Sequence, residues 1–151
     1  MDINDKAPDF SLLDQNGNKV SLKDFKGKTV VLYFYPKADT PGCTIQACEF
    51  RDNFKKFDKV DAVILGVSPD KPEDQKKFAD KFDVPFRLLA DTEKKVAQAY
   101  DVWKEKNMYG KKVMGIERST FVIGPDGKLK KIQRKVKAEG HAAQILEGLK
   151  E

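Results

Sequence analysis

The chain of 151 residues contains few side chains that could serve redox chemistry or metal binding, with only two cysteines and one histidine. It also lacks any run of the roughly 18 apolar residues that a membrane-spanning helix requires, so we expect no membrane association. Its first six residues, MDINDK, have neither the basic start nor the apolar stretch of a secretion signal. We therefore predict a cytoplasmic protein, in a compartment where thiols stay reduced.

The composition excludes a disordered chain, because 40% of the residues are apolar and 35% are charged. The length fits one domain over residues 1–151. A net charge of +5 leaves nucleic-acid binding to be considered. However, the densest basic stretch, Lys128–Lys137, has the apolar spacing of a half-buried strand and no aromatic residues for base stacking. We expect no nucleic-acid partner.

Strands and helices are predicted to alternate along the chain, which is typical of an α/β fold with a largely parallel sheet. A hairpin around Asn16-Gly17 comes first, and a second hairpin around Gly124–Gly127 comes near the end. The expected strands are Phe10–Leu13, Lys19–Leu22, Thr29–Tyr35, Val60–Val67, Arg87–Leu89, Ser119–Ile123 and Lys128–Val136. The expected helices are Pro41–Phe57, Lys71–Phe82, Thr92–Tyr100 and His141–Leu149.

The first cysteine lies where the buried strand Thr29–Tyr35 runs into a helix, at the sheet edge where α/β proteins bind ligands. Thr40 is a good N-cap, Pro41 suits the first helical position, and Cys43 then occupies the third. Free backbone N–H groups and the positive end of the helix dipole favour a thiolate there. The alternative is a small side chain that closes the first turn.

The second cysteine, Cys48, is five residues further along the same predicted helix. Helix geometry rotates it by roughly 140° from Cys43 and separates the two Cα atoms by about 8–9 Å. A disulfide needs less than about 7 Å. Either the two thiols never bond, or the helix unwinds when they do. A metal site is not expected, because a structural zinc needs four ligands and His141 is far away and more typical of a surface residue.

The segment FYPKADTPGCT resembles the peroxiredoxin signature Pro-x-x-x-Thr-x-x-Cys, through Pro36, Thr40 and Cys43. Cys48 and the distal segment YGKKVMGIERSTFVIGPDGK, which includes Arg118, are similar to the Q-type subfamily, also called bacterioferritin comigratory proteins. The resemblance covers nearly the whole chain. It implies a thioredoxin fold with an N-terminal β-hairpin extension and an inserted helix, and a monomer without a cofactor.

The resemblance also implies a mechanism. Cys43 would attack hydrogen peroxide or an organic hydroperoxide and become a sulfenic acid. A larger thiolate population alone does not make a fast peroxidase, because nucleophilicity falls as the thiolate is stabilised. Donors to the peroxide are therefore expected from Thr40, Arg118 and the backbone N–H groups of Gly42 and Cys43, while Pro36 shields the thiolate.

In the second half of the implied cycle, Cys48 would form a disulfide with Cys43 that thioredoxin or a glutaredoxin-like dithiol reduces. Gln46 is a candidate polar neighbour of this site, although an exposed helix residue is the favoured interpretation. Two other hypotheses stay open: a general disulfide oxidoreductase or thiol-based holdase, and an interaction protein that only shares the fold.

Overall fold

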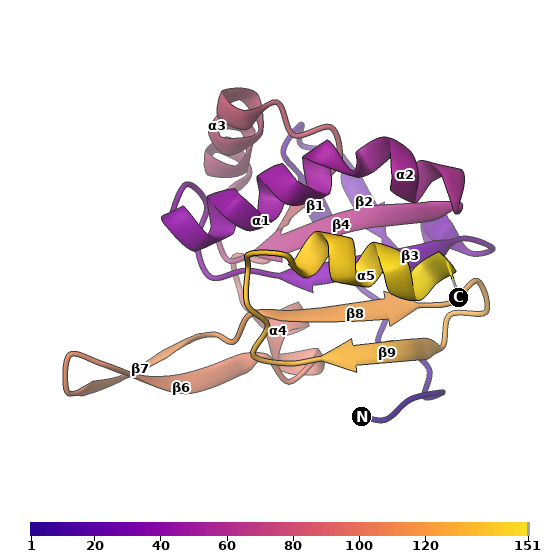
Figure 1. Ribbon diagram of the computed structural model, residues 1–151. Helices are drawn as coiled ribbons and strands as arrows, with labels where there is room; N and C mark the ends of the chain where they lie inside the picture. The colour runs from indigo at the N-terminus through magenta and orange to yellow at the C-terminus, as the bar shows by residue number, and fades with distance from the viewer. Residues whose placement is uncertain (151) are drawn as a thin grey trace.

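A seven-stranded mixed sheet forms the centre of the molecule (Figure 1). The computed structural model describes residues 1–150. The strands of this sheet are β1 (Ser11–Asp14), β2 (Lys19–Ser21), β3 (Thr29–Phe34), β4 (Ala62–Ser68), β5 (Arg87–Ala90), β8 (Ser119–Ile123) and β9 (Leu129–Gln133). Their order across the sheet is β2-β1-β5-β4-β3-β8-β9. The three middle strands β3, β4 and β5 are parallel, and the hairpins at both edges pair antiparallel, as predicted.

Helices cover both faces of the sheet, because its central strands are apolar on both sides. The helices are α1 (Pro41–Asp52), α2 (Phe54–Lys59), α3 (Pro72–Phe82), α4 (Lys95–Ala99) and α5 (His141–Lys150), with a short 3₁₀ helix η1 (Leu22–Phe25). Figure 1 shows α1, α2, α3 and α5 on one face and α4 on the other.

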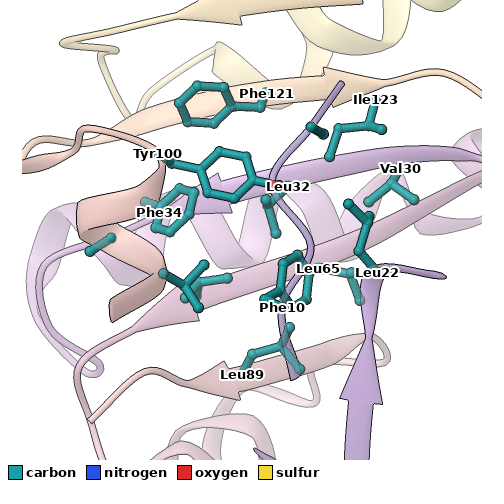
Figure 2. Packing of buried hydrophobic residues seen from close by; sticks show 14 of the residues in the cluster. Phe10, Leu22, Val30, Leu32, Phe34, Leu65, Leu89, Tyr100, Phe121 and Ile123 are labelled. Atoms are coloured by element: carbon teal, nitrogen blue, oxygen red, sulfur yellow. The ribbon is translucent and has the colours of Figure 1, made fainter. Parts of the chain in front are cut away.

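Strand β3 divides the hydrophobic core into two clusters. Val31 and Tyr33 point toward the face that carries α1 and α5. Leu32 and Phe34 point to the opposite face, where Figure 2 shows them beside Tyr100. All of these side chains are buried, which confirms the prediction of a central strand that is enclosed on both faces.

The long helix predicted from Pro41 to Phe57 is interrupted at Asn53. The side chain of Asn53 donates a hydrogen bond to the carbonyl oxygen of Glu49 at 2.8 Å, and its backbone N–H bonds to the same oxygen at 3.2 Å. Asn53 is the C-cap residue of α1 and the N-cap residue of α2, and its side-chain bond to the backbone favours a break at this position. The predicted Thr92–Tyr100 helix is also shorter, because it begins only at Lys95.

A hairpin that the sequence analysis did not predict follows α4. It consists of β6 (Trp103–Met108) and β7 (Lys111–Ile116), which pair antiparallel and project from the body of the protein (Figure 1). Its turn is Tyr109-Gly110, with φ of 54° and 77°, the two positive values of a type I′ hairpin turn. Within residues 1–150 no helix has the length and apolar character needed to cross a membrane.

Candidate active site

A short loop, residues 35–40, joins the carboxyl end of β3 to the start of α1, as the sequence predicted. Thr40 is the N-cap residue, with extended backbone angles, and Pro41 is the first residue of the helix. The Thr40 hydroxyl does not cap the helix but donates to the carbonyl oxygen of Lys37 at 2.7 Å. The first helical turn therefore presents backbone N–H groups that the cap side chain does not occupy.

Cys43 and Arg118 are in direct contact at this helix start. The Cys43 side chain is buried, and Nη2 of Arg118 donates a hydrogen bond to its Sγ at 3.3 Å. Arg118 reaches this position because β8 runs antiparallel to β3, with Ser119 paired to Phe34 at the end of the strand. A cationic donor thus lies beside the sulfur at a helix N-terminus, and both features stabilise negative charge placed there.

The backbone at Gly42 leaves space for this arginine. A Cβ atom at position 42 would lie 3.0 Å from Nη2 of Arg118. Any larger residue would thus press on the guanidinium group, so glycine here permits the close approach of arginine and helix.

Gln46 lies inside the site, and the expectation that it is an exposed helix residue was wrong. Its side chain is fully buried, and its Oε1 accepts a hydrogen bond from Nη1 of Arg118 at 2.6 Å. One guanidinium group therefore bridges Cys43 and Gln46, which lie one helical turn apart on the same face. The amide Nε2 of Gln46 has no hydrogen-bond partner in the described part of the chain.

His141 is likewise buried, which corrects the expectation of a surface position at the start of the last helix. Its Nε2 lies 2.7 Å from Oγ1 of Thr120 on β8. Burial lowers the pKa of His141 to about 4, and the positive charges of Arg118 and Lys131 act in the same direction, while a hydrogen bond with Gln144 opposes them. The imidazole is thus neutral at pH 7. The described residues contain no group of three or more side chains suited to a metal.

Cys48 is half-buried in the same uninterrupted helix as Cys43, and both thiols are free. The structure therefore represents the state in which the helix is intact and the cysteines are not bonded.

A polar network holds the loop that precedes α1. Asp70 accepts hydrogen bonds from the backbone N–H of Ala38 at 2.7 Å and from the Ser68 hydroxyl at 2.6 Å. Gln75 of α3 donates to Ser68 at 2.8 Å and accepts from the Tyr35 hydroxyl. Half-buried Pro36 lies within this tethered loop. The network fixes the chain on the strand side of the cysteine.

Lys106 of the projecting hairpin is a neighbour of the site that sequence reasoning missed. Partial burial lowers the pKa of Lys106, and the positive charge of Arg118 lowers it further, whereas Cys43 and Glu117 raise it. The hairpin thus brings an additional cation into the electrostatic environment of Arg118. The Tyr109-Gly110 turn of this hairpin was the sequence signal that could have predicted the two strands around it.

Comparison with known proteins identifies the family of the chain. The model of the AhpC/TSA family matches residues 3–132. Peroxiredoxin Bcp from Bacillus subtilis is 54% identical over 151 residues, covering 100% of this chain and 96% of the relative. Peroxiredoxin Bcp from Escherichia coli is 46% identical over 147 residues, covering 97% and 94%.

Solved structures show the same fold. A mutant of Xylella fastidiosa PrxQ superposes with a TM-score of 0.94 at 38% identity, covering 99% of this chain and 96% of the other. The bacterioferritin comigratory protein of Xanthomonas campestris, studied for its alkyl peroxide reduction activity, gives 0.89 at 43% identity, covering 93% and 90%. The predicted thioredoxin-like fold is confirmed. The chain belongs to the AhpC/TSA family and is a peroxidase of the peroxiredoxin class, similar to the Bcp and PrxQ proteins.

Proposed function

We propose that this peroxiredoxin reduces hydrogen peroxide and organic hydroperoxides at Cys43, and that Cys48 resolves the resulting Cys43 sulfenic acid as a disulfide. The observation that carries the proposal is the contact of 3.3 Å between Arg118 Nη2 and Cys43 Sγ at the N-terminus of α1. The alkyl peroxide reduction named for the Xanthomonas campestris relative supports organic hydroperoxides as substrates.

In the first step, the Cys43 thiolate attacks one oxygen of the peroxide. An S–O bond forms and the O–O bond breaks, so the thiol is oxidised by two electrons to a sulfenic acid. The leaving oxygen takes up a proton and departs as water or an alcohol. Arg118 and the N–H groups of Gly42 and Cys43 stabilise the charge that develops on that oxygen.

Thr40 and Pro36 contribute to the same step. The Thr40 hydroxyl proton is bonded to Lys37 in the free protein, so a bound peroxide would replace that acceptor. Half-buried Pro36 shields the sulfur from water, which keeps the electrostatic interactions of the site strong.

In the second step, Cys48 attacks the sulfenic sulfur and releases water, and a Cys43–Cys48 disulfide forms. The two Cα atoms of an intact helix are too far apart for this bond, so part of α1 must melt. A dithiol reductant of the thioredoxin class then returns both thiols to the reduced state by exchange.

Mass spectrometry after one equivalent of hydrogen peroxide tests the proposal. We expect a loss of about two mass units that maps to a Cys43–Cys48 peptide pair. Cys48→Ser should retain the first turnover but lose thioredoxin-linked recycling, whereas Cys43→Ser should lose peroxide consumption altogether. Full activity of Cys43→Ser would refute the role of Cys43, and insulin reduction without peroxide consumption would indicate a disulfide oxidoreductase instead.

A further inference from the structure

The residue after Cys48 joins α1 to the last helix of the protein. Both carboxylate oxygens of Glu49 accept the backbone N–H of Gly140, at 3.0 and 2.9 Å. Gly140 directly precedes α5, so Glu49 supplies the anionic cap of a helix that lies beside α1 in the fold (Figure 1). A carboxylate at a helix N-terminus is stabilised by the unpaired N–H groups and by the helix dipole.

The next two residues fix the chain further. Phe50 is fully buried and stacks on Tyr33 with a centroid distance of 4.7 Å. Nη1 of Arg51 donates a hydrogen bond to the carbonyl oxygen of Phe82, the last residue of α3, at 2.7 Å. Residues 49–51 are thus attached to α5, to the core and to α3 in succession.

Cys48 is directly adjacent to this anchored stretch. If the two cysteines bond only after part of the helix melts, the melted part must lie on the N-terminal side of the buried Phe50. Glu49 is then the hydrogen-bonded anchor next to Cys48, and it has to loosen, together with the buried Ala47, before the turn that carries Cys48 can open. Its hydrogen bonds are exposed to solvent, so water can replace them at a small free-energy cost.

We infer that Glu49 is a positioning residue for the resolution step: its carboxylate, bound to Gly140, holds the Cys48 turn in helical form and thereby limits how fast the Cys43–Cys48 disulfide forms. This inference rests on the proposed roles of the two cysteines. It assigns to Glu49 no part in the attack on peroxide, because its bonding partner belongs to α5 and not to the Arg118 site.

Rapid-quench mass spectrometry of Glu49→Gln tests the inference. We expect the disulfide to form about three- to tenfold faster than in the wild type, since helix caps have a strength of this order. The rate of sulfenic acid formation, which depends on peroxide concentration, should be unchanged. At high peroxide concentration less of Cys43 should be overoxidised to the sulfinic acid, which adds two oxygen atoms to the thiol.

Glu139→Gln is the matched control, because Glu139 is exposed one residue before Gly140 and makes no side-chain ion pair within residues 1–150. It removes the same charge near the same helix end and should leave both rates unchanged. Glu49→Asp retains the charge with a shorter reach and should give an intermediate rate of disulfide formation.

Equal disulfide rates in Glu49→Gln and the wild type would overturn the inference, as would a general fall in stability that changes both steps equally. Failure of the proposed function gives a different result, because then the wild type itself would form no Cys43–Cys48 disulfide.

Discussion

The two halves of α1 are held in place by very different means. In the first half, the polar side chains Cys43 and Gln46 depend on a single guanidinium group, that of Arg118. In the second half, Glu49 binds α5, Phe50 fills an aromatic cluster and Arg51 binds the end of α3. The helix is continuous in its backbone but uneven in its anchoring.

This difference means that the first half of α1 carries the reactive thiol, whereas the second half attaches the helix to the rest of the fold. The reactive thiol lies in the half whose buried polar side chains bond to Arg118, and Cys43 and Ala47 also pack in the core cluster there. These side chains are small, so this half can lose order locally at a lower cost than the half that holds Phe50. The second half adds the bulky Phe50 to this packing and binds α3 and α5, so it contributes more to the stability of the fold. The comparison therefore predicts which substitutions act on stability and which act on reactivity.

The largest effect on the free energy of unfolding is expected from Phe50→Ala, which removes a buried side chain from the second half of α1. Phe50 contacts the rings of Tyr33, Phe57 and Phe86, and its loss should reduce the free energy of unfolding by about 3–5 kcal/mol. Ile45→Ala, on the exposed side of the first half, should change it by less than about 0.5 kcal/mol. Urea denaturation measures both values, and similar losses in the two variants would contradict the proposed asymmetry.

Arg118→Gln tests the hydrogen-bonded support of the first half. The rate constant for the reaction with peroxide should fall about 10²- to 10³-fold, because a donor to the sulfur and to the developing charge is removed. Arg118→Lys keeps the charge but cannot bridge Cys43 and Gln46 in the same way, so its rate should lie between those of the wild type and Arg118→Gln. Stopped-flow measurement of peroxide consumption decides this, and an unchanged rate in Arg118→Gln would remove the arginine from the chemistry.

Low pH should lower the stability of the fold through protonation of His141, which packs beside the second half of α1. The ring of His141 lies 6.3 Å from that of Phe50. The pKa of His141 is lowered to about 4 in the folded protein, so the unfolded chain binds more protons between about pH 6.5 and pH 4. The contribution of the neutral imidazole is fully present above pH 6.5, and stability should fall by about 2–4 kcal/mol as the pH drops to 4.

Denaturation curves of His141→Gln across the same pH range provide the control. This variant lacks the titrating group, so its stability should depend less steeply on pH between 6.5 and 4 than that of the wild type. Parallel pH profiles would show that other groups cause the acid sensitivity.

Gln46→Ala should have the smallest effect, since it leaves Arg118 in contact with Cys43 but removes the acceptor that orients it. We expect about a tenfold slower reaction with peroxide, consistent with the loss of one charge-assisted hydrogen bond. Gln46→Glu retains an acceptor oxygen and should recover most of the rate. If alanine and glutamate variants react equally, Gln46 does not orient the arginine.

Local rules were sufficient to predict the start of this site. The strand Thr29–Tyr35, the N-cap Thr40 and Pro41 at the first helical position follow from short-range preferences, and the structure has all three features within one residue. Arg118 could be placed only through the family resemblance, because its contact with Cys43 joins positions 75 residues apart.

The burial of Gln46 and His141 was not predicted for a related reason. Polar residues on helices are usually exposed, and only the packing of α1 and α5 onto the sheet shows that both side chains are enclosed. The hairpin β6–β7 escaped prediction because its strands are rich in lysine and most side chains of β7 are exposed. Neither strand therefore has the apolar alternation of a core-facing strand.

The tethered loop before α1 has a consequence for chain entropy. With Ala38 held by Asp70 on one side and Phe50 held by the core on the other, a melted segment would be a loop of roughly ten residues between fixed ends. Such a loop gains less conformational freedom than a free helix end, which limits how far disorder spreads. A fixed span also keeps the two sulfur atoms at high effective concentration, so the bond between them would form within the loop rather than with another molecule.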